Sequence, residues 1–79
     1  AKKVINVQFS KAYDKIELDD YTVVKHNQNV ATLTNNDGVV FHAKDFISKI
    51  SEKYDVVDFS VEAISVDEVL AKVYKDYNL

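Results

Sequence analysis

DFSVEAISVDEVL, residues 58–70, passes from the periodicity of a strand to that of a helix without a linker. Before Ser65, apolar and polar residues alternate, so that Val57, Phe59 and Val61 share one face, as in a half-buried strand. After Ser65, the apolar spacing is helical. A strand therefore leads directly into a helix near the end of the chain. If Phe59 belongs to the core, Phe59→Ala should cost about 3 to 5 kcal/mol of stability.

The junction also carries the signals of a helix start. Ser65 is a suitable N-cap, because its hydroxyl can accept a hydrogen bond from an unpaired backbone N–H of the first turn. Glu68, three residues later, can reach back to the Ser65 N–H and complete a capping box. Ile64 and Val69 can pack together as a hydrophobic staple. Ser65 and Glu68 are therefore predicted to form the structural cap of the last helix.

Three further strands are predicted upstream. Residues 4–9 alternate between apolar and polar side chains. Residues 21–25 and 30–34 are rich in β-branched side chains, and the two Asn residues within 26–29 suit the turn of a hairpin between them. Residues 16–18 could add a short extended piece.

Two amphipathic helices are predicted, over residues 43–54 and 66–77. The first follows a turn at Asp37-Gly38, which contains the one glycine of the chain. Its apolar face consists of Ala43, Phe46, Ile47, Ile50 and Tyr54. The apolar face of the second consists of Val66, Val69, Leu70, Val73 and Tyr77.

The order of these elements is strand, hairpin, helix, strand, helix. Because both helices need an apolar surface, we expect a single α+β domain over residues 1–79, built as a two-layer sandwich. Its sheet has four strands, or five if residues 16–18 pair or if residues 39–41 form a short strand rather than the lead-in to a helix, and is mostly antiparallel. Both helices are expected on one face of the sheet, in a generally ferredoxin-like architecture.

Composition argues against several classes of function. The net charge is −3, and all ten basic residues are Lys, so the basic patch typical of nucleic-acid binding is missing. One glycine cannot supply a phosphate-binding loop or a dinucleotide fingerprint. His26 and His42 lack further ligands at metal-binding spacing, and the chain has no cysteine. We therefore predict no catalytic, cofactor or metal site within this chain.

Three segments carry a family resemblance: residues 3–9 (KVINVQF), 56–62 (VVDFSVE) and 65–74 (SVDEVLAKVY). In this order, they resemble the accessory domain at the C-terminal end of ABC transporter ATP-binding subunits that serve drug, antibiotic or sodium exporters. The chain departs from the family pattern at Val66, Asp67 and Leu70, where Leu, Glu and Phe are usual.

The resemblance implies that the chain is a non-catalytic piece from the C-terminal end of a longer ATP-binding subunit. ATP and Mg²⁺ would be bound only by the upstream domain. The piece would act by packing on its own nucleotide-binding domain, the twin ATPase subunit or the membrane permease, without inserting into the membrane. It would lie in the cytoplasm at the inner face of the cell membrane. The motif residues that could dock are Glu68, Val69, Leu70 and Tyr74.

Two alternatives remain open from the residues themselves. Glu68 as a cap partner and Val69 and Leu70 as core residues explain the same motif without any partner, and Tyr74 and Tyr77 could likewise close the core. The chain could also be a free-standing module that binds a small molecule or dimerises.

Overall fold

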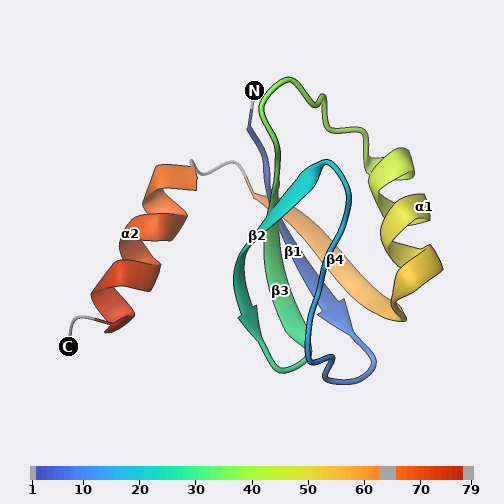
Figure 1. Ribbon diagram of the computed structural model, residues 1–79, viewed down its shortest axis with the longest axis horizontal. Helices are drawn as coiled ribbons and strands as arrows, with labels where there is room; N and C mark the ends of the chain where they lie inside the picture. Colours follow the sequence, from blue (N-terminus) through green and yellow to red (C-terminus); the bar gives the residue numbers. More distant parts are fainter. Residues whose placement is uncertain (1, 63–65, 78–79) are drawn as a thin grey trace.

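The fold is a four-stranded antiparallel sheet with two helices (Figure 1), in a computed structural model that describes residues 2–62 and 66–77. The strands are β1 (Val4–Phe9), β2 (Tyr21–Asn27), β3 (Val30–Asn35) and β4 (Val56–Glu62), and the helices are α1 (Ala43–Lys53) and α2 (Val66–Tyr77). The sheet order is β2-β3-β1-β4, and every neighbouring pair is antiparallel. The predicted α+β class and four-stranded sheet are confirmed.

The core lies between α1 and one face of the sheet. Phe46 and Ile50 of α1 are buried against Ile5, Val7, Phe9, Ala31 and Leu33 of the strands. Residues 16–18 form no fifth strand, because the chain there is a loop that inserts Ile16 and Leu18 into the same core. Residues 39–41 form no strand either and lead into α1. The predicted apolar face of the first helix is largely right, although Ala43 is exposed and Tyr54 is the C-cap residue.

The side chains of β4 face differently from the prediction. A register shift pairs Phe9 with Val56 and Gln8 with Asp58, which leaves Val57 without a partner on β1. Val56 therefore packs against the core, whereas Val57 is 60% exposed. The expectation that Val57 faces the core together with Phe59 is wrong, because it assumed unbroken alternation through this irregularity.

The hairpin of β2 and β3 is confirmed, with a tighter turn than expected. The two strands extend to Asn27 and from Val30, so that only two residues lie between them. Gln28, rather than an Asn, adopts the left-handed backbone, with φ 55°. The predicted turn at Gly38 also has a positive φ, 83°.

The two helices lie on opposite sides of the sheet rather than on one face, as Figure 1 shows. One side is filled by α1 and residues 16–18. Val4 alternates with Ile5 and so points to the other side, where it is only 1% exposed. α2 lies beside β2, away from α1. It begins at Val66, while Ile64 and Ser65 lie outside the described residues, so the predicted cap and staple are not tested.

Candidate docking surface

The chemical groups most often used in catalysis or metal binding are dispersed. In the described ranges, no group of three or more His, Asp or Glu residues is arranged to hold a metal ion. His26 places Nε2 3.0 Å from the Gln28 carbonyl oxygen in the hairpin turn. His42 precedes α1 and makes no side-chain capping bond there. His26 belongs to β2 and His42 directly precedes α1, so the two imidazoles lie on separate elements.

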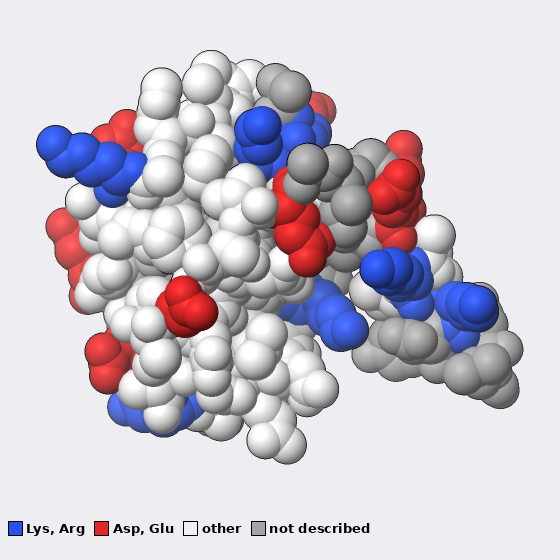
Figure 2. All heavy atoms as spheres, turned by 180° about the vertical axis from the view of Figure 1, so that it is seen from behind, with Lys and Arg blue, Asp and Glu red and all other residues white. Residues whose placement is uncertain are grey.

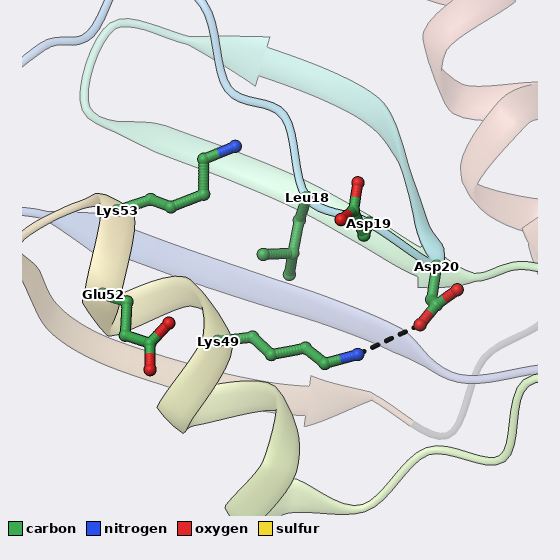
Figure 3. A pocket seen from close by; sticks show the side chains of 6 residues that line it. All are labelled: Leu18, Asp19, Asp20, Lys49, Glu52 and Lys53. Carbon is green, nitrogen blue, oxygen red and sulfur yellow. Dashed lines mark hydrogen bonds and ion pairs between the residues drawn. The ribbon is translucent and has the colours of Figure 1, made fainter.

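A hollow of about 480 Å³ lies between α1 and the loop that enters β2 (Figure 3). It is lined by Leu18, Asp19, Asp20, Lys49, Glu52 and Lys53. Lys49 Nζ donates to Asp20 Oδ2 at 3.0 Å, and Lys53 Nζ donates to the Glu17 carbonyl oxygen at 2.8 Å. Both amines therefore already have acceptors within the chain.

The hydrogen bond and charge of Asp20 raise the pKa of Lys49 above its ordinary value of 10.5. Since both side chains are about half exposed, this pair is a weak tie between α1 and the loop. Figure 3 shows the Lys49–Asp20 bond reaching across one end of the hollow. The charged lining is best explained as a set of contacts that hold α1 against the loop.

The predicted docking motif lies on α2. Glu68 is exposed in the first turn of the helix, and Leu70 is half-buried. Tyr74 is 63% exposed, although the sequence favoured a place for it in the core. The side chain of Val69 lies outside what the structure describes. The helix therefore brings Glu68, Leu70 and Tyr74 onto one element, and its own sheet does not cover all of its apolar residues.

Other exposed apolar residues were missed by sequence reasoning. Val40 is 72% exposed in the loop before α1, and Val61 of β4 is 42% exposed. Val57 is also exposed. Because Val56 and Val57 are adjacent and equally apolar, this doublet was the sequence signal that the alternation of apolar and polar residues in β4 could break there. On the face shown in Figure 2, Lys and acidic side chains are scattered, without a continuous basic patch.

The edge of the sheet formed by β4 is a further candidate, because no described element pairs with its outer side.

Neither helix in the described part of the chain is long and apolar enough to cross a membrane. Comparisons of the chain with protein-family models, with curated proteins and with solved structures found no match.

Proposed function

We propose that this chain is a non-catalytic accessory domain of an ABC transporter ATP-binding protein and that it acts by packing against other domains or subunits. Its partners are the upstream nucleotide-binding domain, the twin ATPase subunit or the permease. ATP and Mg²⁺ belong to the upstream domain in this proposal, and the permease holds the assembly at the inner face of the cell membrane.

The exposure of α2 carries this proposal. The helix lies across the sheet from α1 and beside β2 (Figure 1), and Leu70 is half-buried while Tyr74 is 63% exposed. Tyr is among the residues that contribute most to binding at the centres of protein interfaces. These residues also belong to the segment with the densest family resemblance. The order of the elements, with a strand at the start and a strand followed by a helix at the end, agrees with that resemblance.

The first experiment asks which polypeptide carries this sequence in the cell. An antibody raised against the chain is used on native lysate after separation of membranes. The proposal predicts a band several times larger than 9.0 kDa that sediments with membranes. A band near 9.0 kDa in the supernatant would contradict it and would favour the free-standing module.

The second experiment tests docking through α2 in the intact protein. Tyr74→Asp should reduce the recovery of the permease or ATPase partner in detergent extracts, because it places a charge in the apolar contact. Val40→Asp is the matched control, since Val40 is a similarly exposed apolar residue in the loop before α1. Equal recovery with both variants would show that α2 is not the docking element.

A further inference from the structure

β4 is an end strand whose outer side is left unpaired by the described residues. It has seven residues, and Val57 and Val61 are exposed along it. β2, the other end strand, is interrupted by a bulge, carries Lys25 and lies beside α2. Bulges, lysines and covering elements protect strand edges from pairing with other chains. β4 has its own irregularity at Val57, near its start, but it carries no lysine, so its edge from Asp58 onward is the less protected of the two.

The backbone groups that β4 presents at this edge follow from the hydrogen bonds of β1. The Phe9 N–H donates to the Asn29 carbonyl oxygen at 2.8 Å, on the β3 side. Val7 lies two residues away and points its N–H and C=O in the same direction, away from β4. Because Phe59 is directly opposite Val7, its own N–H and C=O must point away from β1. The same reasoning turns the backbone of Val61 outward.

The Phe59 N–H has found a local acceptor at this edge. It donates to Oδ1 of Asp58 at 2.8 Å, within the same strand and in an exposed position. The Phe59 N–H can exchange this acceptor for a better aligned carbonyl oxygen of another strand, because the Asp58 carboxylate can then accept a hydrogen bond from a different donor.

We propose that two copies of this chain associate by antiparallel pairing of β4 with β4, with Phe59 opposite Phe59 of the second copy. In this register, Asp58 lies opposite Ser60 of the second copy, and Val61 lies opposite Val57. Moving the two-fold axis by one residue in either direction slides the strands by two residues, and it would place Asp58 opposite Asp58 or opposite Glu62 of the second copy. Like charges directly opposite each other are destabilising. Larger shifts leave Phe59 beyond the end of the opposing β4.

The pairing satisfies every group that it displaces. Each Phe59 N–H donates to the Phe59 carbonyl oxygen of the second copy, and each Asp58 carboxylate accepts from the Ser60 hydroxyl of the second copy. Asp58 and Ser60 belong to the close, non-hydrogen-bonded type of pair, in which side chains approach most nearly. The interface is self-complementary about a two-fold axis, and it joins the two sheets into one.

The test is the concentration dependence of the mass of the chain, measured by sedimentation equilibrium. Ser60→Lys should strengthen dimerisation, because the ammonium faces Asp58 of the second copy. Ser60→Asp should weaken it. Two symmetric pairs predict a change of roughly two- to thirtyfold in the dimerisation constant in each case. Asp58→Lys combined with Ser60→Asp should restore dimerisation, because it exchanges the charges of the pair.

Ser48→Asp is the matched control, since Ser48 is exposed on α1 and the charge change is the same. Circular dichroism verifies that each variant is folded, and hydrogen exchange should show slower exchange of the Phe59 amide in the dimer. A monomer at every concentration would overturn the proposal. A dimer in which Ser60→Asp behaves like Ser48→Asp, or in which the Phe59 amide is not protected, would place the interface elsewhere and would equally overturn it.

Discussion

Phe46 of α1 and Phe59 of β4 should contribute unequally to stability, because Phe46 is enclosed by the core whereas Phe59 lies on the strand at the end of the sheet. Phe46 is fully buried, and its ring centroid lies 4.9 Å from that of Tyr21 and 5.8 Å from that of Phe41. Phe59 packs on Phe46 at 6.4 Å but remains only half-buried. The same substitution to alanine should therefore have unequal costs at the two positions.

Phe46→Ala should cost about 3 to 5 kcal/mol, because it removes a whole ring from a closed core. Phe59→Ala should cost about 1 to 2 kcal/mol, since part of the ring is already in contact with water and its removal leaves no closed cavity. A domain of this size has a total stability of roughly 4 to 12 kcal/mol, so Phe46→Ala removes a large part of it. Because each kcal/mol shifts the melting temperature of such a domain by about 4 to 8 °C, Phe46→Ala should lower it by about 12 to 40 °C.

Urea unfolding followed by circular dichroism measures both values, at protein concentrations low enough to keep the chain monomeric. If Phe46→Ala fails to fold, Phe46→Leu gives the same ordering at a smaller cost. A cost for Phe59→Ala as large as that for Phe46→Ala would refute the reasoning, because it would require β4 to be covered within the monomer.

Three further predictions concern polar contacts. Asp20→Asn should lower the pKa of Lys49 measured by NMR, and a pKa that does not change would contradict the pairing. Because the folded-state pKa of Lys49 lies above 10.5, the ion pair stabilises the fold below pH 10.5, and this stabilisation is lost as the pH rises through the raised pKa. Asn35→Ala should cost about 1 to 3 kcal/mol in urea unfolding, because this 2% exposed side chain bonds two backbone groups, whereas a silent substitution would show that water replaces it. Thr34→Val should leave stability unchanged or raise it by about 1 kcal/mol, because Thr34 Oγ1 is buried without a partner among the described residues, and a clear loss of stability would reveal a hidden bond.

The elements of the fold could be predicted because each has a clear local period. Residues 4–9 alternate, residues 30–34 are rich in β-branched side chains, and Phe46 and Ile50 recur at helical spacing, so the type of each element follows from its local sequence. The facing of β4 could not be predicted, because Val56 and Val57 are equally apolar and the register shift depends on β1. The side of the sheet on which α2 lies also depends on tertiary packing. Val4 was the available signal, since an apolar residue that alternates with Ile5 requires cover on both faces.

The same limit applies to the candidate surfaces. Tyr74 was singled out from the sequence, but its exposure depends on how far the sheet covers α2, which no local pattern contains. The open edge of β4 follows from the strand order β2-β3-β1-β4, a property of the whole sheet. Ser60 gains significance only from that order and from the direction in which Phe59 points its backbone.

The strand order also separates the two proposed interactions. α2 lies beside β2, at one end of the sheet, and β4 forms the other end. Pairing of β4 with β4 would therefore place the two α2 helices at the outer ends of the joined sheet, where each can contact its own partner. Mutations at well-separated sites act independently. Tyr74→Asp should thus reduce partner recovery and leave the dimerisation constant unchanged. Ser60→Asp should weaken dimerisation and leave partner recovery unchanged. If sedimentation showed that Tyr74→Asp also dissociates the dimer, the two copies would be joined through α2, and the pairing of the β4 edges would be wrong.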